Sequence, residues 1–211
     1  SLPREKEDIA YAAQHGMWFC PTHVVCKTLP DYVWNGKQLT EVEHFEDLPE
    51  CIRKRWEEEN EITCENYRKL GIKPDFQTII DRGRTFLEYS DRVMAGTDCP
   101  YAGVVPGFAM ADELESLVDA YGMTRYAALA AATSRPAEYI GISDQKGKLL
   151  PGLDSDLIVL EENPLEAVGA VRKIRMVFQG ENVWDKEVLD GFLKAAGRLT
   201  QEEIEFIPLK I

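Results

Sequence analysis

Short apolar runs alternate with amphipathic helical stretches through the first part of the chain. Residues 5–15 carry apolar side chains at helical spacing, and Gly16 ends that pattern. The runs 17–20 (MWFC) and 93–95 (VMA) are short and apolar throughout. Such runs are typical of strands buried on both faces, as in a parallel sheet surrounded by helices. The pattern therefore predicts an α/β fold.

Four further helical stretches are predicted, at residues 50–70, 76–88, 111–120 and 125–132. In the first stretch, a single helix or a helix pair, we expect Trp56 and Ile62 to face the interior and the acidic run 57–59 to face solvent. Thr124 is the predicted N-cap of the last helix. Residues 27–49 are interrupted by prolines and an Asn-Gly pair, so a loop is predicted there. It either covers a site or is a passive surface excursion.

The period of the pattern changes after residue 145. A strand and turn are predicted at 147–152, a strand at 156–160 and an alternating strand at 171–180, and the tail from residue 185 reads as helical and then extended. We therefore expect an α/β part at 1–145, a small β part at 146–184 and a tail at 185–211.

Composition excludes some classes of function. The 211 residues are 45% hydrophobic and carry a net charge of -13, which argues against binding to nucleic acid or to an anionic membrane. No apolar run approaches the roughly 20 residues of a membrane span, and the charged first residues lack the apolar core of a signal peptide. The five cysteines are irregularly spaced and predict free thiols rather than a disulfide framework, so we expect a cytoplasmic protein.

The stretch around Asp98 is the first candidate for chemistry. The apolar run 93–95 is followed by Gly96, and Asp98 arrives where the predicted strand ends, before Pro100. The C-terminal ends of parallel barrel strands are where such enzymes keep their reactive groups. Asp is also common in turns that simply follow a strand. From this stretch alone both readings stay open.

A second candidate is the set Cys20, His23 and Cys26, whose thiols and imidazole have a plausible spacing for zinc. No second pair with matching spacing follows, and Pro21 hinders wrapping around a metal. His23 also follows the predicted strand 17–20, so it is a candidate for contact with substrate or metal.

The remaining candidates are single residues. His15 lies near the end of a predicted helix, where a cation is favourable, and His44 lies in a polar loop and is expected to be solvated. Cys99 is either a nucleophile or a packed thiol, and the latter is favoured because no histidine base is evident. Tyr101 and Phe108 line a substrate pocket or pack against helices; Tyr101 is the one predicted to contact substrate.

Several linked motifs resemble the C-terminal part of the metal-dependent amidohydrolases, in particular the imidazolonepropionase-like and prolidase-like members. These are Gly96-Thr97-Asp98, the helix pair that runs from Glu113-Leu114 to Ala132-Thr133, and Gly147-Lys148-Leu149-Leu150-Pro151-Gly152 before the strand 156–160. Ser155 stands where the family usually has Ala. Upstream, residues 14–22 are similar to the family's sixth helix and seventh strand.

The resemblance implies a (β/α)8 TIM-type barrel followed by strands of a small composite β-sandwich. It also implies that Asp98 binds a divalent metal, most commonly zinc, and accepts a proton from the metal-bound water that hydrolyses an amide or cyclic amide C–N bond. A metal lowers the pKa of its water, and a fixed carboxylate then orients and deprotonates it. His23 and Tyr101 would contact a small-molecule or peptide-like substrate.

The family's other metal ligands should lie upstream of Leu2 on this alignment. A complete barrel takes about 250 residues, so the chain resembles the C-terminal portion of an enzyme and we expect it to be inactive alone. The expected partners are the missing N-terminal barrel segment or a complementary chain, and further copies in a homo-oligomer. The alternative is a non-catalytic half-barrel that serves as an assembly or binding subunit.

Overall fold

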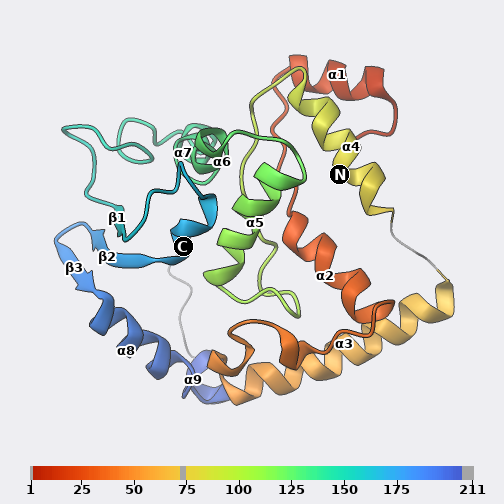
Figure 1. Cartoon of the computed structure of the whole chain (residues 1–211), viewed down its shortest axis with the longest axis vertical. Helices are drawn as coiled ribbons and strands as arrows, with labels where there is room; N and C mark the ends of the chain where they lie inside the picture. The colour runs from red at the N-terminus through yellow and green to blue at the C-terminus, as the bar shows by residue number, and fades with distance from the viewer. Residues whose placement is uncertain (1, 72–74, 206–211) are drawn as a thin grey trace.

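The computed structural model of the chain describes residues 2–71 and 75–205 (Figure 1). Its elements are α1 (Lys6–Gln14), α2 (His23–Val33), η1 (Leu39–Glu41), η2 (Phe45–Asp47), α3 (Glu50–Leu70), α4 (Phe76–Leu87), α5 (Phe108–Asp119), α6 (Arg125–Ala131), α7 (Ser134–Tyr139), β1 (Leu157–Leu160), η3 (Val168–Arg172), β2 (Ile174–Gln179), β3 (Asn182–Asp185), α8 (Lys186–Ala196) and α9 (Gln201–Glu205). Helix α5 lies centrally, α3 runs along one end of the molecule, and the sheet and α8 form a separate side (Figure 1). None of the described helices is long and apolar enough to cross a membrane.

The two predicted inner strands lie side by side and are parallel, but they meet at one residue each. Phe19 pairs with Val93 in an isolated parallel bridge. The Phe19 N–H donates to the Arg92 carbonyl and the Met94 N–H to the Phe19 carbonyl, both at 2.9 Å. The predicted extended strands are therefore wrong in length, because each segment turns away after a single pairing.

Helices pack around this bridge to form the main core. Ile9 of α1, Phe86 of α4, Leu117 of α5 and Ala128 of α6 are each almost fully buried in one cluster with Phe19 and Val93. A second cluster joins the end of α2, the stretch through η1 and η2, α3 and the loop that follows Asp98. The helices predicted from apolar periodicity are thus confirmed, with Thr124 capping α6 as predicted: its Oγ1 accepts the Ala127 N–H at 3.1 Å.

Two predictions about the stretch 27–70 are wrong. The predicted loop begins as helix, since α2 continues through Pro30 to Val33. A proline inside a helix removes one hydrogen bond, and the burial of Tyr32 and Val33 offsets that loss. Ile62 is 62% exposed rather than inward. On one continuous helix, Ile62 lies six residues after the buried Trp56 and so points about 120° away from it.

The C-terminal sheet has the order β1-β2-β3, with both pairs antiparallel. The predicted strand at 147–152 is wrong: the segment forms turns, with Gly147 and Gly152 both at a φ of +91°. The predicted strand at 171–180 starts late, at Ile174, because 168–172 form η3 against α5. Strand β3 was not predicted. The tail is helical in α8 and α9 as predicted, and the expected extended end at 206–211 lies outside the described residues.

Candidate functional site

Asp98 sits in a turn with an unusual backbone. Residues other than glycine rarely adopt a positive φ, and Asp98 does so at 55°. Thr22 does the same at 47°. Thr22 follows the Phe19 side of the parallel bridge and Asp98 follows the Val93 side. Two neighbouring parallel segments therefore end in strained turns, and such strain concentrates at functional sites.

The two turns are held in close contact by a glycine. A β-carbon placed at Gly96 would lie 2.5 Å from Cys20 Sγ and 3.7 Å from the Thr22 methyl carbon. Only glycine allows the segment leading to Asp98 to approach the segment leading to Thr22 this closely. The Asp98 side chain itself is exposed at this end of the bridge.

Helix α2 starts directly after Thr22, but the Thr22 side chain makes no capping hydrogen bond. Instead, Glu113 of α5 reaches across, and its Oε2 accepts the Val24 N–H at 2.8 Å. Glu113 is 0% exposed, and no described residue bonds its Oε1. Burial raises the pKa of Glu113 to about 7, against the opposing effect of the backbone N–H groups of Val24 and His23.

Sequence reasoning missed Glu113. The signal for it was its place on the buried stripe of α5, one residue before Leu114 and four before Leu117. A carboxylate on such a stripe is rarely buried unless it has a hydrogen-bonding or ionic partner, because desolvating a charge is costly.

His23 is buried at the start of α2, with 8% of its surface exposed. Its Nδ1 lies 3.5 Å from the Tyr121 hydroxyl oxygen, and the two rings meet edge to face. Burial, followed by the charge of Lys27, lowers the pKa of His23 below its usual value. The imidazole is therefore kept neutral near physiological pH.

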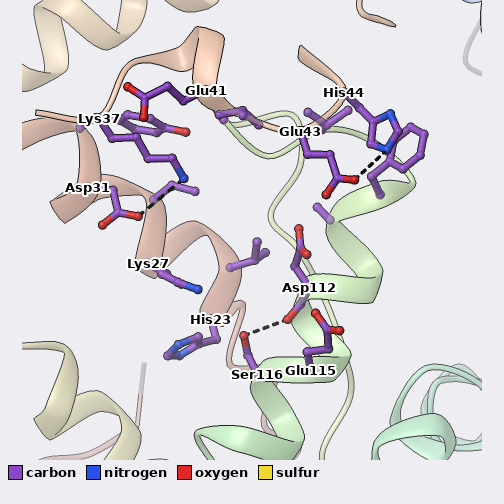
Figure 2. Close-up of a pocket in the computed structure, with 18 of the residues that line it drawn as sticks. His23, Lys27, Asp31, Lys37, Glu41, Glu43, His44, Asp112, Glu115 and Ser116 are labelled. Atoms are coloured by element: carbon purple, nitrogen blue, oxygen red, sulfur yellow. Dashed lines mark hydrogen bonds and ion pairs between the residues drawn. The ribbon is translucent and has the colours of Figure 1, made fainter. Parts of the chain in front are cut away.

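His23 also lines a cavity of about 480 Å³ between α2 and α5. The side chains labelled in Figure 2 come from α2 (His23, Lys27, Asp31), from the stretch 37–44 (Lys37, Glu41, Glu43, His44) and from α5 (Asp112, Glu115, Ser116). Acidic groups outnumber basic ones around it. The stretch 37–44 thus does close one side of a cavity.

The other candidates are placed in different surroundings. Tyr101 lines a separate cavity of about 270 Å³ against α3, not the cavity that His23 lines. Phe108 lines the His23 cavity and stacks on His44 with a ring separation of 3.5 Å. His44 is only partly solvated, with 29% of its side chain exposed, and its Nδ1 also lies 2.7 Å from Asp47 Oδ2. His15 packs on Tyr11 as part of the helix end.

The described residues contain no group of three or more His, Cys, Asp or Glu side chains that could hold a metal. Cys20, His23 and Cys26 therefore do not form a zinc site in the structure. Burial raises the pKa of Cys20, Cys26 and Cys99, which keeps each of them as a thiol. Cys99 packs beside Val24, Val104 and Ala109, consistent with the favoured packed thiol.

The structure is thus an α/β arrangement: a parallel pair of segments, one of which leads to an exposed aspartate, is surrounded by helices and followed by a small antiparallel sheet. The model of the amidohydrolase family matches residues 4–183. The chain belongs to the amidohydrolase family, and the resemblance seen in its motifs is confirmed.

Individual relatives agree with this assignment. Amidohydrolase tasK of Hapsidospora irregularis is 42% identical over 101 residues, which are 48% of this chain and 9% of that protein. The solved structure of bottromycin amidohydrolase has a TM-score of 0.62 at 23% identity, over 91% of this chain and 44% of that one. A prolidase crystallised with N-methylphosphonate-L-proline has a TM-score of 0.57 at 20% identity, over 86% of this chain and 38% of that one. The chain thus spans less than half the length of each of these relatives.

Proposed function

We propose that the chain forms part of the active site of a metal-dependent hydrolase that cleaves an amide or cyclic amide C–N bond. Residues 17–20 and 93–95 would be the seventh and eighth strands of a (β/α)8 barrel, within a barrel part at 1–145. The sheet of β1, β2 and β3 would belong to a composite β-sandwich built from residues 146–184, followed by the tail at 185–211. Family membership and the likeness to amidohydrolase structures support this arrangement.

The observation that carries the proposal is the pair of strained turns at Thr22 and Asp98. They end two adjacent parallel segments on the same side of the bridge, and Gly96 keeps them in contact. Parallel barrels place their reactive groups at this end of their strands. Asp98 is the carboxylate that the turn presents.

Asp98 would bind the metal and accept a proton. A divalent metal, zinc in our proposal, supplies a nucleophilic water at neutral pH. The described residues do not form a metal site on their own; in our proposal the other ligands would be supplied by a preceding barrel segment or a complementary chain. In the hydrolysis, water adds to the carbonyl carbon, Asp98 takes the proton of that water and passes it to the leaving nitrogen, and the C–N bond breaks.

His23 and Tyr101 remain the proposed substrate contacts. His23 is neutral and buried beside the Thr22 turn, so it can accept or donate one hydrogen bond without adding charge. Tyr101 follows Asp98 by three residues. We place the protein in the cytoplasm as a homo-oligomer.

The test is amine release from a panel of N-acyl amino acids, Xaa-Pro dipeptides and lactams by the purified protein, together with its remaining barrel segment and zinc. Asp98→Asn should lower kcat by about 100-fold or more, because a positioned proton acceptor contributes about 10²–10⁴-fold. Bound zinc should fall as well. Asp144→Asn, an exposed aspartate far along the chain from the turn, is the control and should keep full activity.

Full activity in Asp98→Asn would remove this residue from the mechanism. A wild-type assembly that binds no metal and releases no amine from any substrate would instead favour the non-catalytic half-barrel. The chain alone should be inactive and should bind far less than one equivalent of zinc.

A further inference from the structure

Glu113 is a buried carboxylate with no cation beside it. It is 0% exposed, and no ion pair in the described part of the chain includes it. Its neighbour Glu115, by contrast, pairs with Arg172 at 2.8 Å and is partly exposed. A buried charge without a partner lowers stability. Its presence therefore calls for a role other than stabilising the core.

The contact of Glu113 shows what that role is. A helix leaves its first N–H groups without partners inside the helix, and α2 lacks a capping side chain at Thr22. Oε2 of Glu113 accepts the Val24 N–H at 2.8 Å, from a position 89 residues further along the chain. A negative group is also favourable at the positive end of the helix dipole. Glu113 of α5 thus supplies the side-chain capping hydrogen bond that the N-cap residue Thr22 does not make.

This cap ties together the two segments of the proposed site. Val24 follows directly on Thr22 and His23, while α5 follows the loop that leaves Asp98. The Thr22 backbone is strained, so its turn needs support from its surroundings. Without the bond from Glu113, the start of α2 would be held by packing and by the 3.5 Å contact between His23 Nδ1 and the Tyr121 hydroxyl oxygen.

We propose that Glu113 is a positioning residue of the proposed hydrolytic site, which fixes the Thr22 turn and His23 against the segment that carries Asp98. The inference rests on the proposed function. A positioning role differs from a purely structural role in one measurable respect. A folded variant without the capping hydrogen bond keeps the core, but the parts of its site are less well aligned and its rate falls. Misplacement of about 1 Å costs roughly 100-fold in rate.

The experiment uses two variants of Glu113 in the complete enzyme. Glu113→Met has a similar length and no acceptor, and Glu113→Gln keeps an oxygen that accepts the Val24 N–H. We expect Glu113→Met to lower kcat by about tenfold or more with KM within about threefold, a loss confined to the transition state. Glu113→Gln should recover most of that rate. Glu138→Gln, at an exposed glutamate of α7 that lines neither of the cavities described, is the control and should leave kcat unchanged.

Because Glu113→Met leaves a buried N–H without an acceptor, it loses stability. Kinetics are therefore measured at a temperature where each variant is folded, as shown by circular dichroism. Equal kcat in wild type and folded Glu113→Met would overturn the proposal. So would a Glu113→Gln variant as slow as Glu113→Met, because the hydrogen bond would then not be the cause.

Amide hydrogen exchange separates this inference from the proposed function. The Val24 N–H should exchange at least about tenfold faster in Glu113→Met than in wild type, with little change in the α4 amides. The faster exchange of the Val24 N–H is expected whether or not the protein hydrolyses amides. An inactive wild type with the expected exchange would refute the proposed function and leave the cap in place. Unchanged exchange at Val24 would refute the cap itself.

Discussion

The helical body and the C-terminal sheet of this chain are stabilised in different ways. In the body, side chains such as Phe86, Leu117 and Val93 are almost completely buried around the parallel bridge. From residue 140 onward, the buried side chains of the described residues are Val168 and Ala170, and both lie in η3 against α5. The strands and α8 therefore depend on backbone hydrogen bonds and half-buried contacts, although the sequence patterns of both regions are equally apolar.

The difference shows why apolar pattern alone does not measure burial. Ile158, Leu165 and Val183 occupy positions in or beside the sheet and are each about half exposed. Ion pairs such as Lys146 with Asp154 are exposed to solvent and contribute little to stability. Stability of the body should thus respond strongly to side-chain truncation, and stability of the sheet should respond weakly.

The first prediction compares the same substitution in the two regions. Leu117→Ala removes a side chain that is 0% exposed in the body and should lower the free energy of unfolding by about 2–5 kcal/mol. Leu149→Ala removes one that is 84% exposed and should change it by less than about 0.5 kcal/mol. Urea unfolding followed by circular dichroism measures both. A large loss of unfolding free energy in Leu149→Ala would show that Leu149 is covered in solution. The proposed difference between the body and the sheet would then be wrong.

The second prediction concerns the pKa values of carboxyl groups, which shift in opposite directions for Glu113 in the body and Asp156 near the sheet. Glu113 in the body has its pKa raised from 4.5 to about 7 by burial. A raised acid pKa means that the folded state holds the proton more tightly than the unfolded state. The contribution of Glu113 to the free energy of unfolding is therefore fully present below pH 4.5 and is lost as the pH rises through 7. The shift corresponds to a loss of roughly 3 kcal/mol. For exposed Asp156 near the sheet, the hydrogen bond from Lys146 lowers the pKa. Its contribution to stability is therefore present above the ordinary pKa of an aspartate and is lost as the pH falls through the lowered value.

Neighbouring groups make a control necessary for this pH effect. His23 has a lowered pKa and acts with the opposite sign, since its protonation on acidification destabilises the fold. The thiols of Cys20 and Cys26 and the Tyr121 hydroxyl face Glu113 but stay protonated throughout this range. The difference between wild type and Glu113→Gln isolates the carboxyl group. A difference that does not vary between pH 4.5 and 7 would contradict the raised pKa.

Sequence reasoning predicted the helices of the body well because their apolar positions repeat at helical spacing. It placed α1, α4, α5 and α6 and the strand β1 close to their observed bounds. It failed where local signals were overridden by packing. Pro30 suggested a loop, yet the second core holds that segment as helix. Residues 147–152 looked like a strand, yet two glycines with positive φ turn the chain there.

For the site, the sequence pointed to Asp98 and His23 because each follows an apolar run. The sequence gave no sign that Thr22 and Asp98 adopt a positive φ, since neither residue is a glycine. Glu113 was missed for a different reason: its partner Val24 is distant in sequence, and a glutamate on a helix usually faces solvent. Contacts between such distant residues are set by the fold, so only the structure reveals them.

The third and smallest predicted effect concerns the helix caps of the two regions. Thr124 caps α6 in the body, and Asp185 caps α8 beside the sheet, with its Oδ1 accepting the Val188 N–H at 3.0 Å. Replacing either by Ala removes about 1 kcal/mol of helix stability. Helix α6 buries Ala128 and Ala131, so Thr124→Ala should lower global stability by that amount.

Helix α8 has no buried residue, so the loss in Asp185→Ala should stay local. Its amides should exchange hydrogen several times faster while the urea midpoint of the body barely moves, because a helix without buried contacts opens independently. Asp190→Ala, which removes only the exposed pair with Lys186, is the control and should change α8 exchange less. A drop in the body's midpoint in Asp185→Ala equal to that in Thr124→Ala would show that α8 unfolds together with the body, and the two regions would then be one cooperative unit.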